Sequence, residues 1–598
     1  MIEKILELFH KTDFDFREYS NSSDELSYLF DEWVSYYRMK YAICKVLKPK
    51  TILEIGVRYG YSAITFLSAV PDAKYLGIDN DTNTFGGSTG AIRWAKIITK
   101  NYNAGFLIAN TQEMVILPGE SYDLIHIDGQ QDGDGTVHDL ELALPNAKWI
   151  LVDGYFWSKE NMLSATYFLE KYKQFIEYTI IIPSYAGDLL IKLKESAKNI
   201  RISGKDYTDK TIREDYDQTY FLQDCGGYDS FKKHQGKQLT DDRLLAALYL
   251  ASPNRNISIL DIGCGRGELC YALAQAGAYV MGIDYSRSAI SIAEKTFHDA
   301  IKKDNLEFIC DDFLQFNFDK KFDRIIATDF IEHIEKNRWE LVLLKVAGLL
   351  KPGGLFIIHT SPNALNYEVP YEEKRAIARS IGSYLPKDPR TYYEDVMHIN
   401  EQTPDLLTTS LKKHFPHAIV WVATAPDIVG SLARTFATNE TINARNIFAV
   451  ASDSPLDPFH IIHQLVQNPL DTNKLNVKIS VQSYPAIVAP DEHFSVKIIL
   501  NNLSCERWVS LLPNPVHLSY HWLNEKGTYV VFDGIRTAIR YPLLPEENRH
   551  FSLNVVAPKT YGEYVLQVTL VQEACFWFEN IIQTLPVSLT IKTKPDEK

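Results

Sequence analysis

The chain has 598 residues and a formal net charge of −14 at pH 7, from 62 basic and 76 acidic residues. This length predicts three or four domains of about 150 residues each, and the acidic balance, without a basic run, argues against a nucleic-acid partner. The seven cysteines form no C-x-x-C pair, which favours free thiols in the cytoplasm over a disulfide scaffold. No stretch of about 18 apolar residues occurs, so we expect no membrane span, and the charged N-terminal segment predicts no signal peptide.

The first domain is expected over about residues 1–200. It opens with a helical pattern over residues 24–47, followed by "TILEIGVRYGYSAITFLSAVPDAKYLGIDND". This segment predicts a buried strand, a glycine turn, a helix and a second strand that ends at Asp79. Later strands are predicted to end at Asp128 and Asp153. Because ligands of open α/β sheets bind at the carboxyl ends of the strands, these acids and the turn form the candidate site.

The motif "EIG-x-x-x-G-x-S", which begins at Glu54, resembles that of a group of S-adenosylmethionine (SAM)-dependent methyltransferases. The group includes metal-dependent sugar and catechol-type O-methyltransferases. The resemblance implies that Glu54, Gly56 and Asp79 bind SAM. It also implies that Asp128 and Asp153 hold Mg²⁺ and a substrate hydroxyl.

The chain departs from that family pattern after the fourth and fifth strands. Gly154 stands in place of the family's second acid, and Gln130 and Gln131 stand where an acid and a histidine are common. A hard divalent cation needs several oxygen ligands, and the other nearby acids lie on a glycine-rich loop. The alternative interpretation is that these acids cap strand ends or solvate a loop. The first domain would then be an inactive scaffold or an acceptor-binding domain.

The second domain is expected over about residues 201–455, after a polar linker. Residues 257–293, "ISILDIGCGRGELCYALAQAGAYVMGIDYSRSAISIA", repeat the strand, turn, helix and strand, with Asp284 at the end. The turn is G-x-G-x-G and lacks the third glycine of the dinucleotide fingerprint. Asp261, before the turn, would repel a pyrophosphate but suits an ammonium or sulfonium group, while Asp284 can accept both ribose hydroxyls. An NAD-linked oxidoreductase is therefore disfavoured.

Three further fragments follow in order: "LEFICDDF", "FDRIIATDFIEHIE" and "LLKPGGLFIIHTSPN". With the glycine turn, they resemble class I SAM-dependent methyltransferases, including groups that O-methylate quinones and sugars. The resemblance implies that Asp312, or else Asp311, accepts from the adenine amino group; the alternative role is a helix N-cap. The remaining cofactor contacts would come from the following residues: Asp261, Gly263, Cys264, Gly265, Asp284, Tyr285, Asp329 and Phe330.

An alcohol acceptor must lose a proton during methyl transfer, which calls for a general base. His333, in the "IEH" segment, and His398, after an insert over residues 367–395, are the two candidates. Inserts at this place commonly roof the acceptor site in the family. The surrounding segment resembles methyltransferases of bacterial surface-polysaccharide biosynthesis, which implies a saccharide or sugar-linked acceptor. A non-sugar small molecule is the alternative acceptor.

Residues 456–598 alternate apolar and polar residues between turn signals, which predicts seven short strands and an immunoglobulin-like β-sandwich. This part resembles accessory sandwiches of glycan-modifying enzymes, which implies glycan contact. The predicted fold is therefore two doubly wound Rossmann-like methyltransferase domains followed by an all-β domain. A methyltransferase-fold scaffold that binds glycan is the alternative function, and the oligomeric state is open. Six aromatic residues either stack on a sugar or pack in the core: Trp508, Tyr520, Trp522, Phe576, Trp577 and Phe578.

Overall fold

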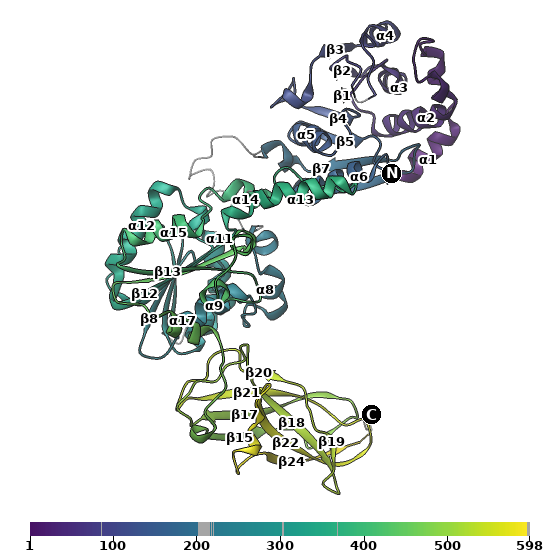
Figure 1. Cartoon of the computed structure of the whole chain (residues 1–598). Coiled ribbons are helices and arrows are strands. Elements are labelled where there is room, and N and C mark those ends of the chain that lie inside the picture. The colour runs from purple at the N-terminus through teal and green to yellow at the C-terminus, as the bar shows by residue number, and fades with distance from the viewer. Residues whose placement is uncertain are drawn as a thin grey trace. The chain divides into compact units, whose positions relative to one another are not determined.

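The computed structural model describes residues 1–84, 86–200, 216, 218, 220–301, 304–367 and 369–594 (Figure 1). The chain divides into two compact units. Unit 1 comprises Met1–Tyr207 and Tyr367–Met397, and unit 2 comprises Thr208–Asn366 and His398–Lys598.

Unit 1 contains a seven-stranded mixed sheet in the order β3-β2-β1-β4-β5-β7-β6. The five strands from β3 to β5 are parallel, and β7 pairs antiparallel with both β5 and β6. The strands are β1 (Thr51–Ile55), β2 (Lys74–Asp79), β3 (Ala104–Ile108), β4 (Tyr122–Ile127), β5 (Ala147–Val152), β6 (Ile176–Ile182) and β7 (Asp188–Leu193). The helices are α1 (Ile2–Lys11), α2 (Phe30–Leu47), α3 (Tyr61–Ala69), α4 (Ile92–Ile98), α5 (Asp134–Ala143) and α6 (Lys159–Lys171).

The insert that interrupts the second domain in sequence belongs to unit 1. Its helices are α13 (Val369–Ser380) and α14 (Tyr392–Met397). Arg375 Nη2 lies 2.7 Å from Asp134 Oδ2 at the start of α5, and the rings of Tyr392 and Tyr172 lie 6.0 Å apart. We expected this insert at the acceptor site of the second domain. Arginine and aromatic residues of the insert have partners in the first domain, and its role at the acceptor site stays a prediction.

Unit 2 begins with a sheet of the same strand order, β10-β9-β8-β11-β12-β14-β13. Its strands are β8 (Ser258–Ile262), β9 (Tyr279–Asp284), β10 (Leu306–Cys310), β11 (Phe322–Thr328), β12 (Leu350–Thr360), β13 (His417–Ala423) and β14 (Asn446–Ser452). The helices are α8 (Tyr228–His234), α9 (Asp242–Ala251), α10 (Glu268–Gln275), α11 (Arg287–Ile301), α12 (Lys336–Leu349), α15 (Pro404–Lys412), α16 (Thr438–Asn443) and α17 (Pro458–Leu465). The prediction of two Rossmann-like α/β sheets is confirmed.

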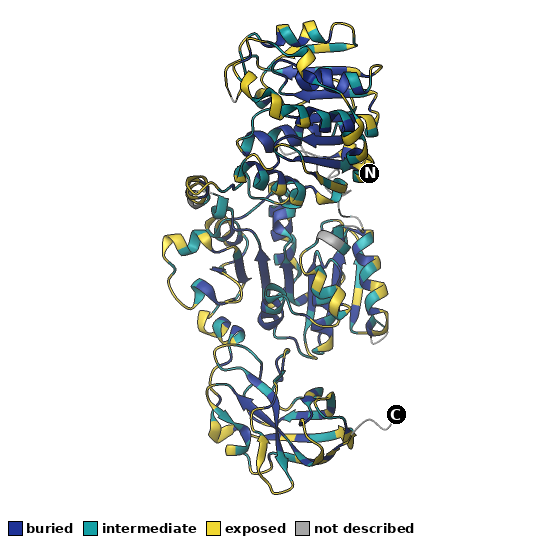
Figure 2. Ribbon diagram, turned by 90° about the vertical axis from the view of Figure 1, so that its right-hand side faces the viewer, coloured by how far each residue is buried: buried dark blue, intermediate teal, exposed yellow. Residues whose placement is uncertain are grey.

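The central strands of both sheets are buried on both faces, as Figure 2 shows in dark blue. Ile259 and Leu260, successive residues of β8, lie in different hydrophobic clusters, so the two clusters cover opposite faces of the sheet. The sequences of parallel strands that helices cover on both sides are nearly continuous apolar runs. This explains why, after the polar first residue (Thr51 or Ser258), β1 and β8 are apolar except for one acid near the carboxyl end.

The C-terminal part of unit 2 consists of two β-sheets around one shared hydrophobic core. Four of the six aromatic residues considered above, Trp508, Tyr520, Trp522 and Phe578, are fully buried in that core. The all-β prediction is confirmed, and the immunoglobulin-like topology stays a prediction. Among the described residues, no helix has the length and apolar character needed to cross a membrane. The strands are β15 (Val477–Ser483), β16 (Ile487–Val488), β17 (His493–Asn502), β18 (Val516–Asn524), β19 (Tyr529–Val531), β20 (Thr537–Ala538), β21 (Asn548–Val556), β22 (Gly562–Gln572), β23 (Phe576–Trp577) and β24 (Val587–Thr593).

Candidate active sites

The glycine turn of the second domain is bonded to the acid at the end of β9. Gly265 N donates to Asp284 Oδ2 at 3.0 Å, and Ser286 N donates to Asp284 Oδ1 at 2.8 Å. Burial raises the pKa of Asp284 to about 6. Gly263 has φ +71°, and a Cβ there would lie 2.7 Å from the ring of Phe330. The turn is thus held by its bonds to Asp284 and has no room for a side chain at Gly263.

Asp261, at the end of β8, keeps one carboxylate oxygen without a protein partner. Its Oδ2 lies 3.1 Å from Cys270 Sγ, while Oδ1 has no hydrogen-bond partner among the described residues. The residue is 2% exposed, and burial raises its pKa to about 7. A buried acceptor without a donor costs free energy, so this oxygen fits the donor group of a ligand. The Sγ atom of Cys264 faces β9. A Cβ atom placed on Gly282 of that strand would lie 2.9 Å from this sulfur.

The acids after β10 are bound by protein groups. Asp312 Oδ1 accepts from Leu314 N at 2.9 Å, and its Oδ2 pairs with Arg338 Nη2 at 2.7 Å. Asp311 is exposed and accepts from the Asp312 backbone N–H at 2.7 Å. Asp312 therefore bonds the backbone of the turn that follows β10, a stretch of described residues in which no helix begins, and the adenine contact stays a prediction.

Asp329 lies at the end of β11 with φ +48°. Its Oδ1 lies 2.8 Å from His359 Nδ1, and its Oδ2 pairs with the guanidinium of Arg243 on α9. Burial and the charge of Arg243 lower the pKa of His359 to about 4, so this imidazole is neutral. The sequence prediction missed Arg243 and His359, because Arg243 is 86 residues away from Asp329 and no motif marks it.

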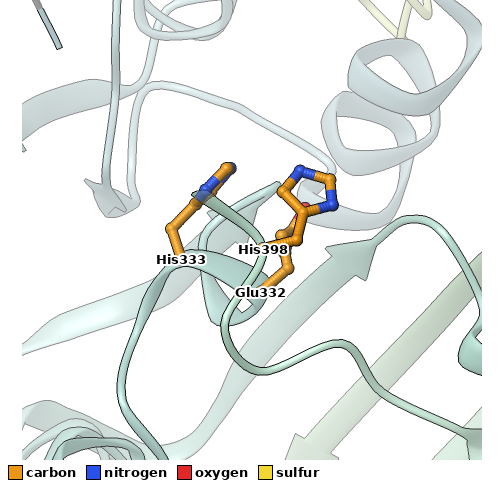
Figure 3. Close-up of side chains that lie close together, drawn as sticks. All are labelled: Glu332, His333 and His398. Carbon is orange, nitrogen blue, oxygen red and sulfur yellow. The ribbon is translucent and has the colours of Figure 1, made fainter. Parts of the chain in front are cut away.

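The two alternative base candidates lie side by side (Figure 3). His333 ends the 3₁₀ turn Ile331–His333 after β11, and His398 follows α14. Their ring centroids are 4.8 Å apart, and the ring of Tyr216 lies 5.7 Å from that of His333. Glu332, which the sequence analysis did not single out, lies beside them and accepts from Thr360 Oγ1 at 2.8 Å.

The first domain has a matching turn and a cavity above it. Val57 N and Arg58 N donate to Asp79 Oδ2 at 2.7 and 2.8 Å, as Gly265 N does to its acid in the second domain. A Cβ on Gly56 would lie 2.0 Å from the carbonyl oxygen of Asp128, so only glycine fits there. The cavity has a volume of about 470 Å³ and is lined by Gly56, Asp79, Asp128 and Asp153 together with Trp33 and Trp157.

Glu54 differs from its counterpart Asp261 because both of its oxygens are bonded within the protein. Tyr75 donates its phenolic hydroxyl to Oε2, and His126 Nδ1 lies 2.7 Å from Oε1. The burial of Glu54 is complete. Its carboxylate is therefore already saturated, which speaks against the predicted contact of Glu54 with SAM.

The candidate metal ligands of the first domain surround a lysine ammonium. Lys40 Nζ lies 2.7 Å from Asp153 Oδ1, 2.9 Å from Asp188 Oδ1 and 3.1 Å from His126 Nε2. Asp128 is close by, and burial raises its pKa well above the usual range. A divalent cation at these ligands would face the positive charge of Lys40. The residues therefore do not fit the expected Mg²⁺, and we derive no chemistry from it.

Two segments of the chain match family models. Residues 53–150 and residues 259–354 each match a model described as a methyltransferase domain. The chain is 33% identical over 104 residues to a ubiquinone biosynthesis O-methyltransferase of Bradyrhizobium diazoefficiens, a match that covers 17% of this chain and 40% of the relative. It is 35% identical over 103 residues to the enzyme of that name from Coxiella burnetii, covering 17% and 42%. The chain thus spans about two fifths of the length of these curated relatives.

Solved structures resemble parts of the chain at low sequence identity. Magnesium protoporphyrin IX methyltransferase from Synechocystis PCC 6803 with bound S-adenosylhomocysteine is 19% identical, covers 41% of this chain and 100% of its own, and has a TM-score of 0.27. The two family matches fall on β1 to β5 and on β8 to β12, the strands whose carboxyl ends hold the candidate residues. Each of the two α/β sheets of this chain therefore lies in a segment that matches a methyltransferase-domain model.

Proposed function

We propose that the chain is a SAM-dependent methyltransferase whose second domain methylates a hydroxyl of a saccharide or sugar-linked acceptor in glycan biosynthesis. The observation that carries this proposal is the pair of acids on either side of the glycine turn. Asp284 is held by the turn, and Asp261 presents a buried oxygen that lacks a donor among the described residues. The saturated Glu54 of the first domain offers no such oxygen.

The residues of this site suit the separate groups of SAM. Asp261 receives the ammonium group, and Asp284 accepts the ribose hydroxyls. Gly263 and Gly265 allow the backbone to approach the cofactor closely. Asp312 or Asp311 receives the adenine amino group. When bound, SAM supplies a methyl group on a sulfonium centre.

The histidine pair provides the base for a hydroxyl acceptor. As the acceptor oxygen bonds to the methyl carbon, the carbon–sulfur bond breaks with its electron pair going to sulfur. The hydroxyl proton goes to the imidazole of His333 or His398. With ring centroids 4.8 Å apart, either ring can serve an acceptor bound in the same place.

The support for a hydroxyl acceptor and the support for a sugar differ. The similarity to relatives named as O-methyltransferases, over two fifths of their length, supports oxygen as the acceptor atom. The sugar rests on the resemblance of residues 359–402 to polysaccharide methyltransferases. A non-sugar hydroxyl compound is the alternative acceptor.

Calorimetric titration of SAM into matched variants tests the proposal. We expect Asp284→Ala to weaken binding by roughly 10- to 100-fold, because hydrogen bonds to a charged group contribute about 1.5–3 kcal/mol. Asp79→Ala makes the equivalent change in the first domain and is the control. Equal SAM affinity in wild type and Asp284→Ala, or no binding in wild type, would reject the second domain as the cofactor site.

A second candidate function is glycan contact by the C-terminal sheets. Tyr529 and Phe532 are about half exposed, at 49% and 50%, and the ring of Phe532 lies 5.6 Å from that of Trp577. Exposed aromatic faces of this kind stack on sugar rings. A glycan array probed with the full chain and with Phe532→Ala tests it. Identical signals, or silence from both, would count against glycan contact at these rings.

A further inference from the structure

Glu332, His333 and His398 form a cluster in the second domain whose possible ligand atoms all lie within 4.8 Å of one another. We propose that this cluster binds a divalent transition-metal ion, with Zn²⁺ as its simplest occupant, and that the ion holds the acceptor hydroxyl. Metal binding stands on the cluster alone. The role toward the acceptor rests on the proposed methyltransferase function.

The ligand atoms of the cluster are slightly farther apart than they would be around one bound ion. Zn²⁺ binds nitrogen and oxygen at about 2.0–2.2 Å, so ligand atoms around it are roughly 3–3.5 Å apart. The present separations, up to 4.8 Å, exceed this by at most roughly 1.3–1.8 Å. The three side chains lie close together (Figure 3).

Glu332 is a buried carboxylate for which the described part of the chain offers no cationic partner. It is 1% exposed, and no lysine or arginine among the described residues pairs with it. A buried charge of this kind is costly unless it is paired or coordinates a metal. Thr360 Oγ1 donates to its Oε2 at 2.8 Å and so fixes its orientation. In the first domain, by contrast, Lys40 neutralises the buried acid Asp153.

His398 is positioned as a metal ligand with an outer carboxylate. Its side chain is 12% exposed, and its Nδ1 has no hydrogen-bond partner among the described residues, lying 3.4 Å from Glu401 Oε1. Metal-binding histidines commonly direct their second nitrogen to a carboxylate. Asn400 N donates to the carbonyl oxygen of Glu332 at 3.0 Å, which ties the His398 loop to the turn that carries the other two ligands.

The ligand set selects the kind of ion. Two imidazoles and one carboxylate suit Zn²⁺ and its first-row neighbours, whereas Mg²⁺ and Ca²⁺ require mainly oxygen ligands. Three protein ligands leave a position open for a substrate oxygen. A hydroxyl bound there loses its proton to water near neutral pH, so with the ion present the two imidazoles act as its ligands and no longer as the base. The imidazoles then hold the ion, and the alkoxide oxygen bonds to the methyl carbon as the carbon–sulfur pair goes to sulfur.

Zinc titration of the full, tag-free, chelator-treated chain tests the proposal without an acceptor. The variants are Glu332→Gln, His398→Ala and Thr360→Val, with His298→Ala as the control because His298 is 69% exposed and outside the cluster. We expect wild type and His298→Ala to bind about one more equivalent of Zn²⁺ than the two ligand variants. Thr360→Val should bind it roughly tenfold more weakly, as loss of an outer-shell contact does.

Cobalt absorption and SAM calorimetry separate the remaining outcomes. Co²⁺ in the cluster gives visible d–d bands without a thiolate charge-transfer band, which the free cysteines would produce. Equal zinc stoichiometry in all variants, or a thiolate band that the ligand variants leave unchanged, would overturn the metal site. If SAM does not bind while zinc behaves as expected, the proposed function fails and the metal site stands.

Discussion

Lys40 Nζ lies 2.7 Å from Asp153 Oδ1 inside the first α/β domain, with the lysine side chain fully buried. A second acid, Asp188, is also buried and lies 2.9 Å from the same ammonium. Asp153 follows β5, at the place where the sequence resemblance predicted a metal ligand. An ammonium instead supplies the positive charge beside this acid.

Replacing Lys40 by Met should strongly destabilise the first domain. The change leaves Asp153 and Asp188 buried without their cation, and breaking a buried ion pair from one side costs about 3–5 kcal/mol. Hydrogen-exchange mass spectrometry of peptides from β4 and β5 measures it. Lys11→Met is the control, because Lys11 is 66% exposed and its ion pair contributes little. Equal protection of β4 and β5 in both variants would contradict the buried network.

SAM affinity should rise with pH because Asp261 must ionise to receive an ammonium group. Its pKa is about 7, so its ionised fraction grows roughly tenfold between pH 6 and pH 8. The same raised pKa stabilises the ligand-free domain below about pH 4, and this contribution is lost as pH rises through about 7. Calorimetry at both pH values should show the increase in wild type and a clearly smaller one in Asp261→Asn. An unchanged pH dependence in that variant would exclude Asp261.

Local patterns predicted the glycine turns and the acids near the carboxyl ends of β1, β2, β8 and β9. The turn and both strands lie within about thirty residues, and apolar runs with glycine define that unit. The lysine partner of Asp153 and Asp188 was not predictable in the same way. Lys40 is 113 residues from Asp153 and 148 from Asp188, so only the folded sheet brings them together.

The placement of the insert was equally beyond local patterns. Its helical periodicity says which face of α13 is apolar but not which domain covers that face. Arg375 is 241 residues from Asp134, its partner in unit 1. Because inserts at this place in the resembling family commonly cover the acceptor site, we expected contact with the second domain. The observed partners in unit 1 include both long-range charge pairs and aromatic rings.

Removing the charge of Arg243 should raise the pKa of His359. Burial and the Arg243 charge together hold that pKa at about 4, so Arg243→Leu leaves burial alone to oppose protonation. We expect an upward shift toward the ordinary 6.5 in an NMR titration of the His359 ring protons. Arg338→Leu is the matched control, since Arg338 pairs with Asp312 instead. A shift of equal size in the control would show that the Arg243 charge is not the cause.

Asp134→Ala should loosen the insert from the first domain. Its Oδ2 lies 2.7 Å from both Arg375 Nη2 and Arg379 Nη2, and Tyr384 donates to Oδ1 at 3.2 Å. Because Asp134 is 33% exposed, solvent weakens its ion pairs. We therefore expect the free energy of local opening of α13 to fall by about 1 kcal/mol, which corresponds to roughly fivefold faster amide exchange.

Salt provides an independent check on this charge cluster. Raising the ionic strength from about 0.05 M to 0.5 M shortens the screening length several-fold and should speed exchange in wild-type α13 but not in Asp134→Ala. Asp132→Ala is the control, because the side-chain bonds of Asp132 to described residues stay within its own loop, to Gln130 and to the Gly135 N–H. If α13 exchanges equally fast in all three proteins at low salt, aromatic packing through Tyr392 and not charge holds the insert in unit 1.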